Sequence, residues 1–277
     1  MPILHAIVLG IVQGLSEFLP ISSSGHLILG PELFHWTELT DHESLNKTFD
    51  VALHVGTFVG AAWYFRYDLI RYIGAAWRSL RERAIRSTDE RIAWLLLVSA
   101  IPGAIVGAAF EGPIEDHLGQ PVLVGVMLIV FAAVLYLADR LPARRHQEEF
   151  RLRDALLMGG AQAVALQPGV SRSGITISMG RWLEFDRVAA TRLSFLMSLP
   201  IIAGAGLFKG AKVIRDGGIP DAYVAPFLWG VLFAAISGFL AIWLLLKILQ
   251  TRSFTPFVIY RFVVGAAVIV IFGFGLR

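Results

Sequence analysis

The sequence predicts an all-α polytopic membrane protein, an inverted repeat of two halves with six transmembrane helices and two re-entrant helix–loop–helix hairpins. Of its 277 residues, 56% are hydrophobic and only 16% are charged, against about 25% charged in a typical soluble domain. Two long apolar regions are broken near their middle by proline, glycine and serine, and the two breaks share a motif. The composition therefore indicates a membrane protein, and the shared motif indicates a repeat.

Six segments are long and apolar enough to cross a bilayer, which needs a helix of about 20 mostly apolar residues. We expect these spans at residues 49–66, 92–111, 120–139, 190–208, 224–247 and 256–275. The broken regions, 2–30 and 155–183, fit this template badly. Irregular backbone at membrane depth is tolerated only where it is buried in protein or lines a watery cavity. We therefore expect each region to dip in and return to the same face; the alternative is that both cross, giving eight spans.

The two broken regions echo each other when they are aligned on Ser-x-Ser-Gly. The first contains the run Gln13–His26 (QGLSEFLPISSSGH), and the second contains the run Gln162–Gly174 (QAVALQPGVSRSG). The offset is 149 residues, and it also brings Gly10 into register with Gly159. Because a carboxylate stands in one copy and an arginine in the other, we expect one composite site built from both copies.

Basic residues predict the orientation, because cytoplasmic loops carry an excess of lysine and arginine. With six spans and two hairpins, four basic regions share one face: residues 66–91, 140–153, 181–192 and 247–252. The acidic stretches 32–43 and 111–116 then face outward. The basic cluster of Lys209, Lys212 and Arg215 also lands outside and is the exception to the pattern.

This orientation makes the first hairpin enter from outside and the second from the cytoplasm. One integral membrane domain thus contains two inverted repeats, residues 1–150 and 151–277, each a hairpin plus three spans. The two loop tips can then meet near the midplane of the membrane.

Composition also excludes several classes of chemistry. Cysteine is absent, so the chain has neither a disulfide framework nor a thiolate nucleophile. The net charge is +3, but basic residues in a membrane protein report topology. We therefore expect no nucleic-acid partner.

Glu17 is a candidate functional residue because it lies within an apolar region. An acidic side chain in hydrocarbon costs roughly 2.5–3.5 kcal/mol on insertion scales. Gln13 lies four residues earlier on the same helical face, and the two side chains could hold a divalent cation through oxygen ligands. The alternative is a structural Glu17 that is protonated or ion-paired.

Ser22, Ser23 and Ser24 precede Gly25 and His26. A serine N-cap here would start a helix whose free N–H groups and positive dipole end point at the loop, which is an anion site. A hydroxyl beside the His26 imidazole also suits nucleophilic or acid–base chemistry. The alternative is that these small residues only pack between membrane helices.

Arg172 is the corresponding feature of the second copy. Its guanidinium offers a fork of donors suited to phosphate, and Ser171, Ser173 and Thr176 add hydroxyls around it. The alternative is that Arg172 pairs with Glu17 and only holds the two halves together.

Three other polar residues have more ordinary explanations. Asp50 and His54 share a helical face and either line the outer vestibule or belong to a solvated helix end. Arg261 is expected to extend towards the cytoplasmic interface.

These motifs resemble those of the undecaprenyl-diphosphate phosphatase family, the bacitracin-resistance type of bacterial membrane phosphatase. The resemblance covers essentially the whole chain. It is carried by the run Gln13–His26 and by PGVSRSGITI over Pro168–Ile177, with further matches at KTFD over Lys47–Asp50 and FTPFVIYRF over Phe254–Phe262.

The resemblance implies a hydrolase that converts undecaprenyl diphosphate to undecaprenyl phosphate and inorganic phosphate, recycling the lipid carrier of bacterial cell-wall (peptidoglycan) synthesis. It implies a multi-pass protein of the bacterial cytoplasmic (inner) membrane, with Mg²⁺ or Ca²⁺ as cofactor and an active site facing the periplasm. The partners are the polyprenyl diphosphate substrate and membrane lipids, and a homodimer stays an open alternative.

The resemblance also assigns roles to single residues. Glu17 is the essential acid, as metal ligand or general base; Ser23 is the candidate nucleophile, and His26 its acid–base or phosphate-binding partner. Arg172 clamps the diphosphate. The hydroxyls expected to bind phosphate are those of Ser22, Ser24, Ser171, Ser173 and Thr176. Gln13 stands where many family members have glutamate, which weakens the expectation of a two-carboxylate metal site.

Two other functions remain open at this point. An inverted-repeat transporter or flippase for a polyprenyl phosphate would use the same anion site without cleavage. A structural membrane protein with an internal polar network is the third alternative. The combination of Glu17, Ser23 and His26 favours an enzyme, because transport needs neither a nucleophile nor a base.

Overall fold

The computed structural model describes residues 1–36, 43–215 and 218–275, and their regular structure is helical. A single isolated bridge, between Arg145 and Phe185, is the exception within these ranges. The elements are α1 (Ile3–Phe18), α2 (Ser23–Phe34), α3 (Glu43–Tyr64), α4 (Arg66–Glu82), α5 (Thr88–His117), α6 (Pro121–Asp139), the 3₁₀ helix η1 (Gln147–Glu149), α7 (Leu152–Val164), α8 (Arg172–Trp182), α9 (Arg187–Arg215), α10 (Asp221–Ile248) and α11 (Thr255–Gly273). The predicted all-α class is confirmed. Of the acidic stretch 32–43, residues 37–42 lie outside the described residues.

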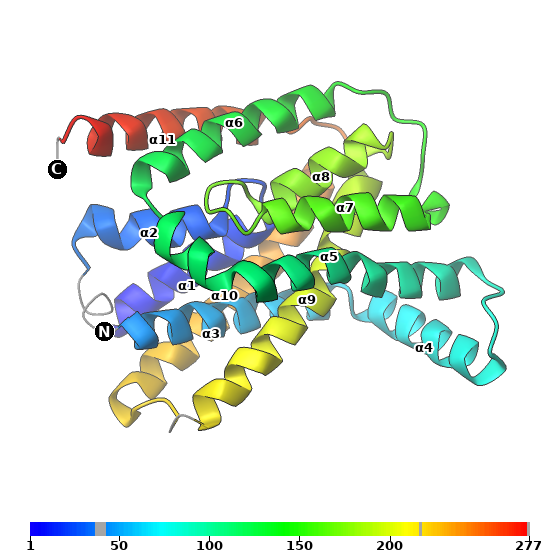
Figure 1. Ribbon diagram of the computed structural model, residues 1–277, viewed down its shortest axis with the longest axis horizontal. Helices are drawn as coiled ribbons and strands as arrows, with labels where there is room; N and C mark the ends of the chain where they lie inside the picture. Colours follow the sequence, from blue (N-terminus) through cyan, green and yellow to red (C-terminus); the bar gives the residue numbers. More distant parts are fainter. Residues whose placement is uncertain (37–42, 216–217, 276–277) are drawn as a thin grey trace.

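Both broken apolar regions form a helix, an irregular loop and a second helix. The first region contains α1 and α2, and the second contains α7 and α8. In Figure 1, the loop between α7 and α8 reaches towards the loop between α1 and α2 inside the bundle. The predicted breaks therefore fall where the motifs are.

Five helices are long and apolar enough to cross a membrane: α5 over Thr88–Phe110, α6, α9, α10 and α11. They coincide with five of the six predicted spans. The sixth, residues 49–66, is covered by α3, which is helical but is not among these five. The chain is thus a multi-pass membrane protein by helix length and composition.

The basic region 66–91 contains a helix that the sequence analysis does not predict. α4 packs on the start of α5 through Tyr72, Ala75 and Ser79, whose Oγ accepts a hydrogen bond of 2.8 Å from Trp94 Nε1. Its other face exposes large apolar side chains three to four residues apart: Tyr67, Ile70, Ile73, Trp77 and Leu80. Figure 1 shows α4 extending beyond the bundle. The helix is amphipathic.

Close helix packing depends on the glycines that the repeat aligns. α1 lies along α10, and a Cβ on Gly10 would come within 2.4 Å of the Gly230 carbonyl oxygen. α7 lies along α5, and a Cβ on Gly159 would come within 2.4 Å of the Ser99 carbonyl oxygen. Small residues let membrane helices approach this closely. The two glycines that the 149-residue register aligns therefore both lie at close contacts between helices.

Candidate active site

Each of the two loops ends at a serine that caps the following helix. Ser22 precedes α2 with a φ of 78°, and its side chain accepts a hydrogen bond from Gly25 N. Ser171 precedes α8 with a φ of 72°, and its side chain accepts from Gly174 N. The predicted N-cap is confirmed, and its counterpart 149 residues later has the same geometry. Both helices therefore begin at the loops, where their first N–H groups can attract an anion.

The two loops touch. Gly169 N donates to Ser22 Oγ at 3.2 Å, and Ser173 Oγ donates to the Leu19 carbonyl at 3.2 Å. Gly169 has a φ of +92°, and a Cβ there would lie 2.6 Å from the Val124 carbonyl oxygen. Only glycine suits that position. The expected meeting of the loop tips is confirmed.

Arg261 hydrogen-bonds to both loops at this junction. This overturns the expectation that it extends towards the cytoplasmic interface. Its side chain is fully buried. Nη1 donates to the Pro20 carbonyl at 3.3 Å in the first loop. Nη2 donates to the carbonyls of Gly169 and Val170 at 2.9 and 3.0 Å in the second loop, and Nε donates to Leu128 O at 3.2 Å. The side chain does not extend to the interface, because three buried loop carbonyls take their hydrogen bonds from it.

Glu17 is the point at which residues from several helices converge. Its carboxylate is 3% exposed and forms an ion pair through Oε1 with Arg172. Oε2 accepts hydrogen bonds from Gln13 Nε2 at 3.1 Å and from Ser23 Oγ at 2.7 Å. The sequence analysis leaves open a Glu17–Arg172 pair, and this pair is present. It joins the two loops and brings the acid, the hydroxyl and the guanidinium together.

The imidazole nearest to Glu17 belongs to His54 rather than to His26. His54 Nε2 lies 3.6 Å from Glu17 Oε2, and its Nδ1 is 2.8 Å from the Asp50 carbonyl oxygen. The carbonyl fixes Nδ1 as the protonated nitrogen, so Nε2 of neutral His54 can accept a proton. His26 instead hydrogen-bonds to Ser22 O through Nδ1 and to Tyr260 Oη through Nε2, each at 2.7 Å.

The other predicted hydroxyls surround the loops at different depths. Ser24 Oγ lies 3.4 Å from Ser22 Oγ, and Ser171 Oγ lies 3.2 Å from Ser173 Oγ. Thr176 is fully buried between α8 and α9, where its Oγ1 is 2.6 Å from Ser194 Oγ and donates to the Arg172 carbonyl at 2.7 Å. Thr176 therefore does not reach Glu17.

A divalent cation would find oxygen donors beside Glu17. Among the described residues, no group of three or more His, Cys, Asp or Glu side chains could hold a metal ion. Gln13 Oε1, however, is buried without a hydrogen-bond partner next to the Glu17 carboxylate. Because Mg²⁺ commonly binds one or two protein oxygens and completes its shell with phosphate and water, this pair fits such an ion in the presence of a phosphorylated substrate.

The residues that sequence reasoning undervalued are His54, Tyr260 and Arg261. His54 shares a helical face with Asp50, a pattern that does not reveal its proximity to Glu17. Arg261 carries a signal, since an ionisable residue inside a span defaults to a functional role. Only the folded structure reveals Tyr260 as the partner of His26.

Comparisons with known proteins show which sequences this chain resembles along its length. The profile of the family described as bacitracin resistance protein BacA matches residues 6–267. The undecaprenyl-diphosphatase of Geobacter sulfurreducens is 47% identical over 271 residues, which cover 97% of this chain and 98% of that protein. The undecaprenyl-diphosphatase of Pelotomaculum thermopropionicum is 46% identical over 272 residues, 98% of this chain and 97% of that protein.

Proposed function

The chain belongs to the bacitracin resistance protein BacA family, and we propose that it hydrolyses undecaprenyl diphosphate to undecaprenyl phosphate and inorganic phosphate. The observation that carries this function is the convergence of Ser23, Arg172 and Glu17, with Ser23 Oγ 2.7 Å from the carboxylate. A hydroxyl, a base and a cation at the start of two helices suit phosphoryl transfer. The full-length similarity to enzymes named undecaprenyl-diphosphatase supports the substrate.

Arg172 provides the main contact to the diphosphate. Its guanidinium has five N–H donors, of which Glu17 occupies part, so phosphate oxygens can take the rest. The N-terminal N–H groups of α8 and α2 add positive potential in the same direction. The serines Ser22, Ser24, Ser171 and Ser173 supply hydroxyls around the loops. These groups bind the phosphates and stabilise the charge that develops during transfer.

Ser23 is the nucleophile and Glu17 is its base. Ser23 Oγ bonds to the terminal phosphorus, the bond from that phosphorus to the bridging oxygen breaks, and undecaprenyl phosphate leaves. The hydroxyl proton passes to Glu17, beside which His54 Nε2 can receive it. Water then attacks the phosphoserine, the phosphorus–Oγ bond breaks, and Oγ regains a proton as inorganic phosphate departs. His26 is held by Tyr260 and hydrogen-bonds to the Ser22 carbonyl, so it positions the first loop and the Ser22 cap.

A divalent cation, Mg²⁺ or Ca²⁺, would be held by Glu17 and by the amide oxygen of Gln13. When bound, it would neutralise charge on the diphosphate. The single carboxylate faces Arg172, so the substrate's own phosphates must contribute much of the negative charge that attracts the ion.

The site requires a specific arrangement in the membrane. We place two inverted repeats, residues 1–150 and 151–277, in the bacterial inner membrane, with six spans and two re-entrant hairpins. The site then opens to the periplasm. Support comes from the basic residues on one face and from the matching caps at Ser22 and Ser171. Both loops come from one chain, so a homodimer is not needed to complete the site.

The experiment is phosphate release from undecaprenyl diphosphate by purified protein in detergent. We expect release with Mg²⁺ or Ca²⁺ and a strong decrease with EDTA. Rapid acid quenching with substrate labelled in its terminal phosphate should trap labelled Ser23, and Ser23→Ala should remove the label. Phosphate release without any protein-bound label would show that water, and not Ser23, is the nucleophile. The transporter would be favoured if no phosphate were released with either cation and lipid phosphate moved across vesicle membranes. Transport does not require the contact between Ser23 and Glu17.

A further inference from the structure

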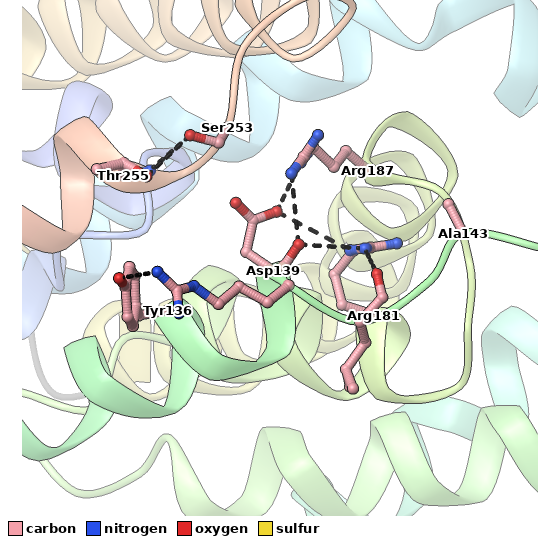
Figure 2. A pocket seen from close by; sticks show the side chains of 9 residues that line it. Tyr136, Asp139, Ala143, Arg181, Arg187, Ser253 and Thr255 are labelled. Atoms are coloured by element: carbon pink, nitrogen blue, oxygen red, sulfur yellow. Dashed lines mark hydrogen bonds and ion pairs between the residues drawn. The ribbon is translucent and has the colours of Figure 1, made fainter.

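A polar pocket lies at the ends of α6 and α8, beside the starts of α9 and α11. Its volume is about 590 Å³. Figure 2 shows Asp139 and Arg187 facing each other, with Arg181 beside them and Ser253 and Thr255 across the opening. Arg140 also lines the pocket. Three guanidinium groups and one carboxylate leave two excess positive charges at this pocket.

Part of the cluster has a structural role. Arg181 is buried and donates to the backbone carbonyls of Leu141 and Phe185, which ties the end of α8 to the segment after α6. Arg187 Nε donates to Asp139 Oδ1 at 2.6 Å, and Phe254 N donates to Asp139 Oδ2 at 3.1 Å. The carboxylate is therefore already shared between a guanidinium and a backbone amide.

Two further arginine groups at the pocket have no acidic hydrogen-bond partner. Arg181 Nε is buried without a hydrogen-bond partner, and it lies 4.0 Å from Asp139 Oδ1. Arg140 stacks over the Tyr136 ring at 4.1 Å and bonds to its hydroxyl, and no carboxylate in the described ranges pairs with it. A buried donor without a partner and an arginine without a carboxylate, both at one cavity, indicate that the cavity suits an anionic acceptor. The acceptor that suits arginines and hydroxyls together is a phosphate oxyanion.

The position of the pocket indicates where this phosphate comes from. α6 and α11 are both apolar enough to span a membrane, and the pocket lies at the last turn of one and the first turn of the other. Leu137 on α6 and Ile259 on α11 are 59% and 57% exposed within one helical turn of lining residues. Apolar surface beside a basic pocket suits a lipid, whose headgroup binds the cations and whose chains cover the helices.

We propose that this pocket binds a phosphate oxyanion, supplied by the headgroup of an anionic phospholipid. It is separate from the Glu17 site. Arg172 starts α8 and Arg181 lies in its last turn, nine residues later, which at 1.5 Å per residue is about 14 Å away. The single negative charge of the phosphodiester would neutralise one of the two excess positive charges, and the headgroup would fill the cavity at the membrane boundary.

The test uses purified, delipidated protein in detergent, titrated with dioleoylphosphatidylglycerol or with zwitterionic dioleoylphosphatidylcholine, and bound lipid is counted by native mass spectrometry. Wild-type protein is expected to bind its first phosphatidylglycerol about tenfold more tightly than phosphatidylcholine. Arg140→Gln should lower the affinity for phosphatidylglycerol about tenfold and leave phosphate release from a short-chain polyprenyl diphosphate unchanged. Arg86→Gln is the matched control, because Arg86 is 73% exposed and pairs with Glu82 elsewhere.

Two results would overturn the inference: equal affinity for the two lipids, or an Arg140→Gln protein that binds like Arg86→Gln. Ser253→Ala gives a second measurement if Arg140→Gln does not fold, and it should weaken phosphatidylglycerol binding while all three arginines remain. A further titration uses inorganic phosphate alone. Displacement of phosphatidylglycerol by millimolar phosphate would overturn the lipid as the source, whereas its retention supports the lipid.

Discussion

At the scale of single residues, the site depends on charges that the sequence reveals and on contacts that it does not. Glu17 and Arg172 stand out because ionisable groups are rare within apolar regions. Their direct pairing could be stated only as one of two alternatives. The sequence predicts that Arg261 reaches the interface, because it lies about five residues from the start of a predicted span and its side chain is long enough to extend there. Its four carbonyl partners belong to three distant segments, and no local pattern encodes them.

Arg261→Met should unfold the junction between the two loops. The substitution leaves the loop carbonyls of Pro20, Gly169 and Val170 without their hydrogen-bond donor, and each buried unpaired group costs about 1–3 kcal/mol. We expect a loss of about 3 kcal/mol or more in the free energy of unfolding, measured by detergent denaturation, together with lower turnover. Arg252→Met, at an exposed position, is the control and should change neither. Equal stability of the two variants would contradict this role of Arg261.

Glu17→Gln should separate the catalytic role of the carboxylate from its structural one. The amide keeps the size of the side chain and can still accept from Ser23, but it cannot take the hydroxyl proton. We expect turnover to decrease by about a hundredfold or more, measured as phosphate release from undecaprenyl diphosphate under saturating substrate. Wild-type turnover in a folded protein would leave Glu17 only the function of pairing with Arg172.

At the scale of elements, the motifs predicted where helices begin and break, because serine caps and proline act locally. Both capped helices start where expected. α4 was missed because its seventeen residues were read as a basic loop. Its apolar residues recur at helical spacing, but they do not form the continuous apolar run that is typical of a membrane span, because the helix is amphipathic.

The contact between α7 and α5 offers a paired test of close packing. Gly159→Ala places a methyl group 2.4 Å from the Ser99 carbonyl oxygen, so the helices must separate, at a cost of about 1–3 kcal/mol. The neighbouring Gly160→Ala meets nothing within 4 Å and should be neutral or slightly stabilising. Thermal unfolding midpoints of the two variants check this. A Gly159→Ala protein as stable as Gly160→Ala would show that α7 does not approach α5 so closely.

At the scale of the whole molecule, composition predicted the membrane class, and the repeat predicted which loops meet. The proposed direction in which each broken region enters the membrane rests on the distribution of arginine and lysine, since helix geometry contains no information about the two aqueous compartments. Long-range pairing of helices also escapes sequence patterns. α1 packs on α10 and α7 on α5 because small residues match across the contact, which no single helix displays.

Single cysteines can test the inverted arrangement on this cysteine-free background. Glu32→Cys, at the exposed end of α2, should react in intact cells with a reagent that cannot cross the inner membrane. Arg144→Cys, where the native side chain is 70% exposed, should react only after permeabilisation. Three spans separate positions 32 and 144 in either topology, so a third variant is needed to distinguish them. Glu184→Cys, where the native side chain is 39% exposed, follows the second broken region and should react from the same side as Arg144→Cys, because that region returns to its own face in the two-hairpin topology. Labelling of positions 144 and 184 from opposite sides, as the eight-span alternative predicts, would contradict the two-hairpin topology.

We propose that the two loops form one phosphatase site, and replacing Arg172, which follows the second loop, tests this proposal. Phosphate release from undecaprenyl diphosphate should be measured for purified wild-type protein and for Arg172→Ala, with unfolding followed in parallel. We expect turnover to decrease by about a hundredfold or more, in line with the loss of a group that stabilises transition-state charge. Wild-type turnover by a folded Arg172→Ala protein would contradict the account, because the second loop would then contribute nothing to the chemistry at Glu17.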